Sequence, residues 1–219
     1  MRAIFAGASG LTGQALLQLL LDQLRYDEVV TLDRRANKPL HVKHRPLQVD
    51  FANLSQLPTC EDAYCCLGTT SKKAGSKEAF RKVDFDYVLN FASAARAAGT
   101  NKFLVVSALG ANASSRVFYS RVKGEMECAV SSIGFEAVHI FRPSFLVGAA
   151  NQTRNESRPI ESLSIAAFSA LSPLLIGPAR KYRPISVSTV SRAMLAAASS
   201  SAVGWNTYES DAMQKLADA

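Results

Sequence analysis

The chain has 219 residues, of which 48% are hydrophobic and 20% are charged, so its composition is that of a globular protein and excludes a disordered one. This length supplies enough apolar surface for one sizeable core and suits a single domain. The 25 Lys and Arg residues outnumber the 18 Asp and Glu residues, and the formal net charge of +7 permits an anionic ligand or a nucleic acid without requiring either.

Short apolar runs alternate with longer segments of helical period, which predicts a parallel sheet covered on both faces. We expect strands over residues 3–6, 28–32, 46–49, 63–67, 102–107 and 137–141, and helices over residues 11–24, 77–98 and 115–132. Further on, we expect a helix over 160–171, a strand over 185–187, a helix over 189–199, a strand near 205–208 and a short helix over 211–217. The predicted fold class is therefore α/β, with a doubly wound parallel sheet of about seven strands.

The organisation of the chain favours one domain with a small C-terminal lid region. Residues 1–143 form the predicted cofactor-binding core, residues 144–183 the substrate or lid segment, and residues 184–219 complete the fold. The longest apolar stretch, residues 163–177, is broken by Pro173 and is too short to span a bilayer. Strand-like residues begin at Met1, so we expect no signal peptide and a cytoplasmic location.

The four cysteines contain no CxxC pair. Cys65 and Cys66 are adjacent within an apolar run, so we expect buried free thiols rather than disulfides or metal ligands. His41 and His44 have no carboxylate or cysteine beside them, and we expect no metal site.

A glycine-rich turn follows the first predicted strand. Gly7, Gly10 and Gly13 are spaced three apart, which lets the backbone turn tightly and approach a pyrophosphate, while the helix that follows points its N–H groups at that anion. The alternative is a tight turn without a ligand, but the strand before and the helix after favour dinucleotide binding. The candidate cofactor-binding residues here are Gly7, Ser9, Gly10, Leu11, Thr12 and Gly13.

The second predicted strand ends with two conflicting signals for the cofactor. Asp33 would bond the adenine ribose hydroxyls of NAD(H), whereas Arg34 and Arg35 match the 2′-phosphate of NADP(H). Residues 34–45 contain five Lys or Arg and no acidic residue, so the local field favours NADP(H) and leaves NAD(H) open. The alternative is a solvated basic loop.

The helix after the fifth strand carries Tyr119 and Lys123, and residues four apart share one helix face. A nearby ammonium lowers the pKa of a phenol, which lets the hydroxyl exchange a proton with a carbonyl or alcohol. Ser107, at the end of the preceding strand, could orient the same oxygen. The alternative makes Tyr119 a boundary aromatic and pairs Lys123 with Glu127.

Together, the glycine turn, Ser107 and Tyr119-x-x-x-Lys123 resemble the short-chain dehydrogenase/reductase superfamily, in its extended and atypical branches. Further resemblance, to the atypical group of the human HIV Tat-interacting protein, rests on four segments: Cys65-Cys66-Leu67-Gly68-Thr69-Thr70, Lys73-Ala74-Gly75, Val83-Asp84-x-Asp86-Tyr87-Val88 and Val122-Lys123-Gly124-Glu125. Arg142-Pro143-Ser144 is similar to the Arg-Pro element from which those branches enter the substrate region, and we count Arg142 among the cofactor-binding candidates.

The resemblance implies a cytoplasmic, NADP(H)-binding oxidoreductase of Rossmann fold, with Ser107, Tyr119 and Lys123 in the catalytic positions. In this interpretation Lys123 also bonds the nicotinamide ribose, and Gly68, Thr69 and Thr70 lie against the middle of the cofactor. The resemblance covers most of the chain through residue 148 and is much weaker beyond it.

One residue departs from the family pattern. Many relatives have an asparagine in the fourth helix that anchors a water relay, whereas this chain has Asp84, which falls on the apolar face of its predicted helix. A buried carboxylate needs a partner, so Asp84 either accepts from backbone amides or faces Lys123. We expect a structural role, and an altered proton relay is the alternative.

Three functions fit these residues to different degrees. The first is an NADPH-dependent reductase of a small carbonyl substrate, and the second is an NADP(H)-binding redox-sensing or regulatory interaction protein. A nucleic-acid-binding role ranks last because the sequence has no recognised motif for it. We therefore expect no nucleic-acid or membrane partner, and leave open a homodimer or a regulatory protein partner.

Overall fold

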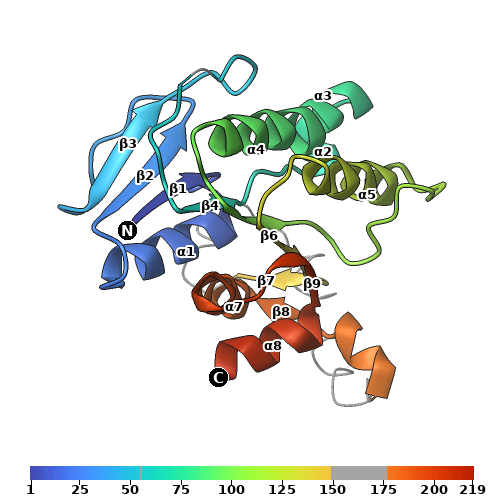
Figure 1. Ribbon diagram of the computed structural model, residues 1–219. Coiled ribbons are helices and arrows are strands. Elements are labelled where there is room, and N and C mark those ends of the chain that lie inside the picture. The colour runs from blue at the N-terminus through green and yellow to red at the C-terminus, as the bar shows by residue number, and fades with distance from the viewer. Residues whose placement is uncertain (55, 149–176) are drawn as a thin grey trace.

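The computed structural model describes residues 1–54, 56–148 and 177–219, and its centre is a seven-stranded sheet in which every strand pair is parallel (Figure 1). In chain order its strands are β1 (Arg2–Ala6), β2 (Glu28–Asp33), β3 (His44–Gln48), β4 (Asp62–Cys65), β5 (Lys102–Val106), β6 (Ala137–Arg142) and β9 (Gly204–Glu209). The spatial order β3-β2-β1-β4-β5-β6-β9 reverses between β1 and β4, which confirms the predicted doubly wound α/β class.

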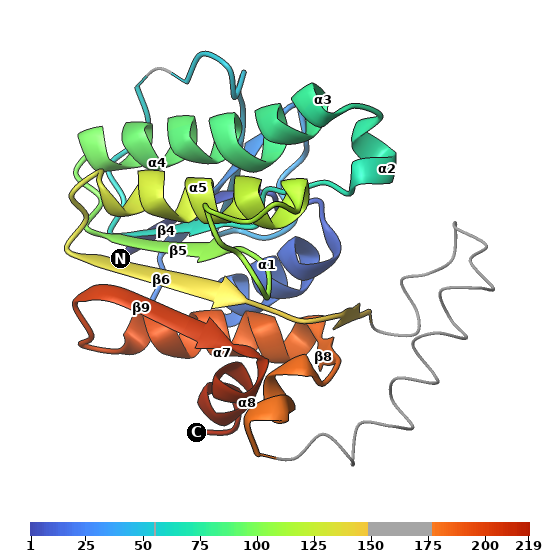
Figure 2. The same ribbon diagram turned by 90° about the vertical axis from the view of Figure 1, so that its right-hand side faces the viewer.

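Helices cover both faces of this sheet. The helical elements are α1 (Leu11–Asp22), α2 (Ser71–Ala74), α3 (Lys77–Arg81), the π-helical turn η1 (Lys82–Asp86), α4 (Tyr87–Ala97), α5 (Phe118–Ser131), the 3-10 helix η3 (Gly177–Tyr182), α7 (Val187–Ser199) and α8 (Ser210–Asp218). Figure 2 shows α4 and α5 on one face and α1, α7 and α8 on the other. The interior of β1 is fully buried because both of its faces are covered, as its continuous apolar run predicts.

Two hydrophobic clusters pack the helices against the two faces of the sheet. Leu16 and Leu20 of α1 pack with Val190 and Met194 of α7 on one face. The other face buries residues of β4, β5, α4 and α5, among them Val105, Val88, Phe91, Met126 and Val130. Because α7 and β9 contribute to this framework, residues 184–219 are part of the same packed body as β1 and α1.

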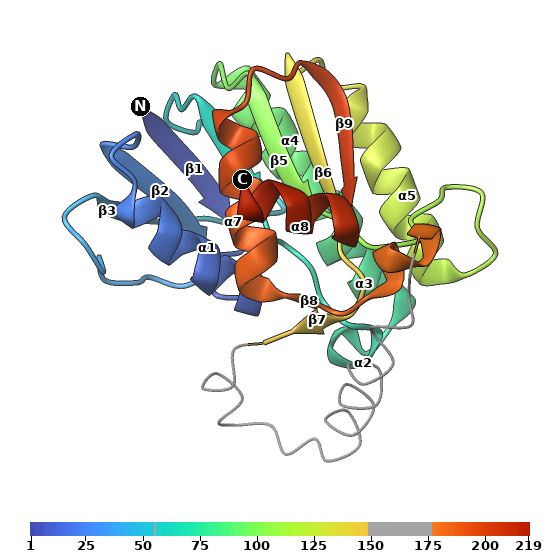
Figure 3. The same cartoon turned by 90° about the horizontal axis from the view of Figure 1, so that it is seen from below.

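The structure corrects the predicted elements in several places. The helix expected over 77–98 is interrupted by η1, and the helix expected over 115–132 begins only at Phe118. The strand β3 lies two residues earlier than expected, and β4 ends at Cys65, where the chain leaves the sheet. A short parallel pair, β7 (Leu146–Val147) with β8 (Ile185–Ser186), lies beyond the carboxyl ends of the strands (Figure 3).

Two expectations fall on residues that the structure does not describe. These are the helix over 160–171 and most of the substrate or lid segment over 144–183.

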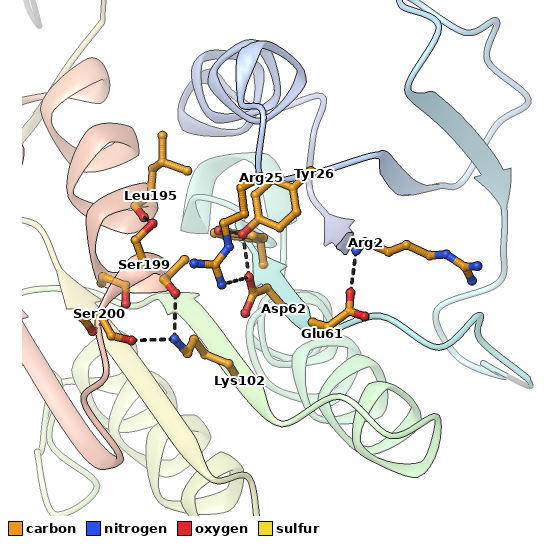
Figure 4. Close-up of polar contacts among 12 residues, drawn as sticks. Arg2, Arg25, Tyr26, Glu61, Asp62, Lys102, Leu195, Ser199 and Ser200 are labelled. Carbon is orange, nitrogen blue, oxygen red and sulfur yellow. Dashed lines mark hydrogen bonds and ion pairs between the residues drawn. The ribbon is translucent and has the colours of Figure 1, made fainter.

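The amino ends of the strands carry a network of polar side chains (Figure 4). The Asp62 carboxylate is 2% exposed and accepts from Arg25 at 2.9 Å and from the Tyr26 hydroxyl at 2.6 Å, and Tyr26 lies 2.7 Å from the Tyr64 hydroxyl. Burial, followed by Asp62, raises the pKa of Tyr26 far above its ordinary value. Nearby, the Lys102 ammonium donates to the Ala198 and Ser200 carbonyls and so fixes the end of α7 to β5.

Candidate functional site

The turn between β1 and α1 is shaped by backbone contacts that only glycine allows. Gly7 has φ +92°, and a Cβ there would lie 2.5 Å from the Cys66 carbonyl carbon. A Cβ at Gly13 would lie 2.0 Å from the Gly7 carbonyl oxygen, so α1 can pack this closely on β1 only with glycine at this position. At Gly10 the nearest contact is 3.6 Å, so this position is more open.

The start of α1 can receive an anion. Gly10 is its N-cap residue, no side chain in the described ranges caps it, and its first turn has no acidic residue. The N–H groups and the positive dipole end of this 12-residue helix are therefore available to a phosphate. Leu11 is half exposed at this end, whereas the Thr12 side chain is buried and its carbonyl accepts from Ser191 of α7.

A cleft of about 520 Å³ begins at this turn and crosses the carboxyl ends of β1, β2 and β4. It brings together seven of the predicted cofactor residues: Gly7, Ser9, Gly10, Asp33, Arg34, Gly68 and Thr69. Its other lining residues, which sequence reasoning did not single out for this role, are Ala8, Leu32, Phe51, Cys66, Leu67, Lys73, Ala74, Ala79, Val83 and Tyr87. No single periodic signal marks them, because they come from loops, from the end of β2 and from several helices.

The predicted residues outside the cleft lining have other neighbours. Arg35 is exposed on the loop after β2, and Thr70 caps α2 by accepting from the Lys73 N–H at 3.2 Å. Arg142 of β6 makes a bidentate ion pair with Glu127 of α5, with Nε 3.0 Å from Oε1. This hydrogen bond with Glu127 is the largest cause of the raised pKa of Arg142. Since Glu127 occupies its guanidinium, we leave Arg142 out of the proposed cofactor site.

Of the three predicted catalytic residues, Ser107 lies directly after β5, and Tyr119 and Lys123 lie on α5. Ser107 follows β5, its N–H donates to Phe141 at 2.7 Å, and its buried Oγ has no hydrogen-bond partner in the part of the chain that the structure describes. Tyr119 is 37% exposed, and its ring lies 5.4 Å from that of Phe80. Lys123, one helical turn further along α5, is only 3% exposed.

The position of α5 depends on a further glycine, Gly124. A Cβ at Gly124 would lie 2.2 Å from the Ala113 nitrogen, so the loop after β5 can cross α5 only here. At the preceding residue of α5, Lys123 Nζ would lie 3.8 Å from a Cβ at Gly68. Gly68 lines the cleft, so Lys123 lies directly behind this part of its wall.

Asp84 joins the cleft to Lys123, the predicted catalytic lysine. Its carboxylate is 1% exposed, with Oδ1 2.8 Å from Lys123 Nζ, and its Oδ2 accepts from the Thr69 N–H at 2.9 Å. Both roles that the sequence left open, amide acceptor and partner of Lys123, are thus realised at once. The alternative pairing of Lys123 with Glu127 is wrong, because Glu127 binds Arg142.

The π-helical turn explains how a charged residue occupies this position. Asp84 lies in η1, where an inserted residue widens the helix, as occurs often at functional sites. Burial alone would lower the pKa of Lys123, but Asp84 and then Tyr119 raise it, and its net shift is upward. Lys123 is therefore charged at neutral pH and held in place.

The cysteines are free thiols, as expected, although their exposure differs. Cys60 and Cys65 are buried and Cys128 on α5 is exposed. Cys66 is only partly buried, which corrects the expectation of burial for the second member of the Cys65-Cys66 pair. Burial raises the pKa of Cys65 to about 12, so this thiol stays protonated beside the cleft.

A search of the described residues found no group of three or more His, Cys, Asp or Glu side chains that could hold a metal ion. Among the same residues, none of the helices is both long enough and apolar enough to cross a membrane.

Comparison with known proteins gives consistent results. The model of the NAD dependent epimerase/dehydratase family matches residues 3–208. Protein HTATIP2 of Rattus norvegicus is 37% identical over 172 residues, which cover 75% of this chain and 69% of that protein. The mitochondrial protein FMP52 of Debaryomyces hansenii is 30% identical over 165 residues, covering 73% of each chain.

Among solved structures, MoeE5 in complex with UDP-glucose and NAD superposes with a TM-score of 0.69 at 16% identity, covering 100% of this chain and 81% of MoeE5. At this identity the likeness concerns the fold, and it confirms the Rossmann-like architecture.

Proposed function

Since the chain belongs to the NAD dependent epimerase/dehydratase family, we propose that it is an NADP(H)-dependent oxidoreductase that reduces a small carbonyl substrate. One observation carries this proposal. Asp84 contacts both Lys123 and the Thr69 backbone, so one buried carboxylate links the wall of the dinucleotide cleft to the Tyr119–Lys123 helix.

The cleft fits a dinucleotide at several points. The glycine turn lets the backbone approach a pyrophosphate, the uncapped start of α1 supplies N–H donors to it, and Gly68 and Thr69 line the same cleft. Asp33 and Arg34 lie at the end that would hold the adenine ribose. We assign the 2′-phosphate of NADP(H) to Arg34 and the exposed Arg35, because guanidinium groups bind phosphate by charge-assisted hydrogen bonds.

Each catalytic residue has a distinct role in the proposed reaction. The nicotinamide, when bound, supplies the hydride. Tyr119 donates a proton to the carbonyl oxygen of the substrate, and the buried Ser107 hydroxyl donates a hydrogen bond to the same oxygen. An ammonium has three N–H donors, so Lys123 can bind Asp84 and still reach the nicotinamide ribose while its charge stays close to Tyr119.

The test is a screen of aldehydes and ketones with NADPH, followed by the loss of its absorbance, on the intact chain and on Tyr119→Phe. We expect turnover with at least one carbonyl class and its loss in the variant, while NADPH still binds by calorimetry. Binding of NADPH with no turnover on any carbonyl would instead support the redox-sensing or regulatory function. A cytoplasmic location and a homodimer or regulatory partner are further proposals that fractionation and light scattering would test.

A further inference from the structure

A hydrogen-bond chain of three side chains ends on Asp33, at the adenine end of the cleft. The Thr31 hydroxyl lies 2.8 Å from Asp33 Oδ2 and 2.9 Å from His44 Nε2. His44 Nδ1 in turn lies 3.1 Å from the Leu40 nitrogen. Thr31 is 1% exposed and His44 is 6% exposed, so two of the three side chains are buried.

The donor and acceptor in each of these hydrogen bonds follow from the two end groups, the Leu40 N–H and the Asp33 carboxylate. The Leu40 N–H can only donate, so His44 Nδ1 is the acceptor and the neutral ring carries its proton on Nε2. Nε2 therefore donates to Thr31, whose single proton goes to the Asp33 carboxylate. Burial lowers the pKa of His44, with a smaller opposing effect of Asp33, which agrees with a neutral ring.

This series of hydrogen bonds connects Asp33, which favours NADH, with the basic loop after β2, which favours NADPH. Asp33 lines the dinucleotide cleft and also a second pocket of about 490 Å³ between α1 and the loop that follows β2. That loop contains the basic residues that follow Asp33. It also contains Leu40, whose N–H is the last group in the series of hydrogen bonds. One set of hydrogen bonds thus holds both the carboxylate that would meet a ribose diol and the loop that would meet a 2′-phosphate.

We propose that Thr31 and His44 are positioning residues that set the preference between NADPH and NADH by fixing Asp33. This inference rests on the proposed function, because it assumes that the cleft binds a dinucleotide. A donor on Oδ2 orients the carboxylate and reduces its repulsion of a 2′-phosphate. Without that donor, Asp33 keeps its full acceptor strength and turns to the ribose hydroxyls of NADH.

The test compares Thr31→Val, which keeps the shape but removes the hydroxyl, with Thr31→Ser, which keeps the hydroxyl. Calorimetry gives the Kd of NADPH and of NADH for each protein, and the ratio within one protein cancels losses of folded fraction. We expect Thr31→Val to move the ratio toward NADH by about fivefold and Thr31→Ser to leave it unchanged, since a hydrogen bond to a charged group is altered only in the first.

A double-variant cycle separates this role from ordinary packing. With Asp33→Asn in the background, Thr31→Val should no longer change the ratio, because the charge that Thr31 orients is gone. The proposal would be overturned if Thr31→Val changed the ratio of the two Kd values equally with and without Asp33→Asn, or changed it in neither case. If the unaltered chain binds neither dinucleotide, the proposed function fails and this inference fails with it.

A measurement on the unaltered chain tests the geometry without any change of stability. In ¹⁵N-labelled protein, with His44 identified from the spectrum of His44→Gln, we expect the Nε2–H tautomer. The Nδ1–H tautomer would contradict the hydrogen-bond direction and so overturn the proposal even if dinucleotides bind.

Discussion

The two ends of the sheet each bury an aspartate in an ion pair, and only one of them is a candidate active site. At the carboxyl edge, Asp84 binds Lys123 and a loop amide that lines a cleft. At the amino edge, Asp62 binds Arg25 and Tyr26, which joins Tyr64 (Figure 4). A buried charge pair by itself therefore does not identify a functional site.

The carboxyl and amino ends of the strands differ in how many polar groups remain free to bind a ligand. The carboxyl edge has an uncapped helix start, a backbone opened by glycine, and the buried Ser107 hydroxyl, which has no hydrogen-bond partner in the described ranges. At the amino edge, the Asp62 carboxylate and the Lys102 ammonium are taken up by side chains and carbonyls of this chain. The carboxyl edge thus combines several neighbouring groups that can bind a ligand. At the amino edge the charged groups mainly bind one another, although Arg25 Nε has no hydrogen-bond partner among the described residues.

The largest expected effect is the loss of turnover when the Tyr119 hydroxyl is removed, and removal of the Tyr26 hydroxyl at the amino ends of the strands serves as its control. Tyr119→Phe should lower reductase turnover by about 10²–10⁴, the usual contribution of general acid catalysis, with little change in Tm or in the Kd of NADPH. Tyr26→Phe is the matched control: it should lower Tm, because Asp62 and Tyr64 lose a buried partner, and leave turnover unchanged. Near-full activity of Tyr119→Phe on a true substrate would disprove the mechanism, though not the fold.

The two aspartates give the next comparison. Asp84→Ala leaves the ammonium of Lys123, whose side chain is 4% exposed, without a counter-charge, so the free energy of unfolding should fall by about 3–5 kcal/mol in urea titrations. Asp62→Ala should cost less, because the Arg25 side chain is 26% exposed and can reach water. Only the Asp84 variant should also weaken NADPH binding, through the Thr69 loop.

Asp84→Asn sharpens this test, because it keeps an acceptor for the Thr69 N–H and should be milder than Asp84→Ala. If both Asp84 variants instead melt like the unaltered chain and differ only in turnover, the carboxylate belongs to the proton relay.

The sequence predicts those parts of the site that local geometry determines. Glycine spacing after a strand predicts the tight turn before α1, the end of the second strand predicts the position of Asp33, and four-residue spacing predicts that Tyr119 and Lys123 share one helix face. The identification of Asp84 as a buried residue in need of a partner also follows from helical period. Seven of the cofactor candidates indeed line one cleft.

Contacts between distant elements could not be predicted in this way. Helical spacing offers Glu127 to Lys123, and only the packing of β6 against α5 shows that Arg142 takes it. The π-helical turn at Asp84 is not predicted, because the apolar residues over 77–98 fit one continuous helix. The β7–β8 pair joins segments nearly 40 residues apart, and pattern reasoning has no means to match them.

A third expected effect concerns pH and lies away from both edges. His139 of β6 is fully buried against Tyr208, and burial, with a smaller effect of Lys102, lowers its pKa to about 4. In the unfolded chain His139 therefore binds a proton below about pH 6.5, whereas in the folded chain it binds one only below about pH 4. Stability should be constant above pH 6.5 on this account and fall by about 3 kcal/mol as the pH drops to 4.

Urea midpoints between pH 4 and pH 7 measure this loss. His139→Phe, which can still stack on Tyr208, should flatten the pH dependence while leaving turnover intact. The same slope in both proteins would assign the acid sensitivity to other groups.

The smallest expected effect is on cofactor choice at the carboxyl edge. Arg34→Ala with Arg35→Ala should bring the Kd of NADPH about tenfold closer to that of NADH, because contacts of exposed guanidinium groups with phosphate are partly screened. Arg2→Ala with Arg192→Ala removes the same charge from positions outside the cleft and should leave the ratio of the two constants unchanged. The preference of the unaltered chain should also weaken as salt rises, since a 2′-phosphate contact is electrostatic. Equal binding of NADH and NADPH to the unaltered chain at low salt would mean that Asp33 outweighs the two arginines.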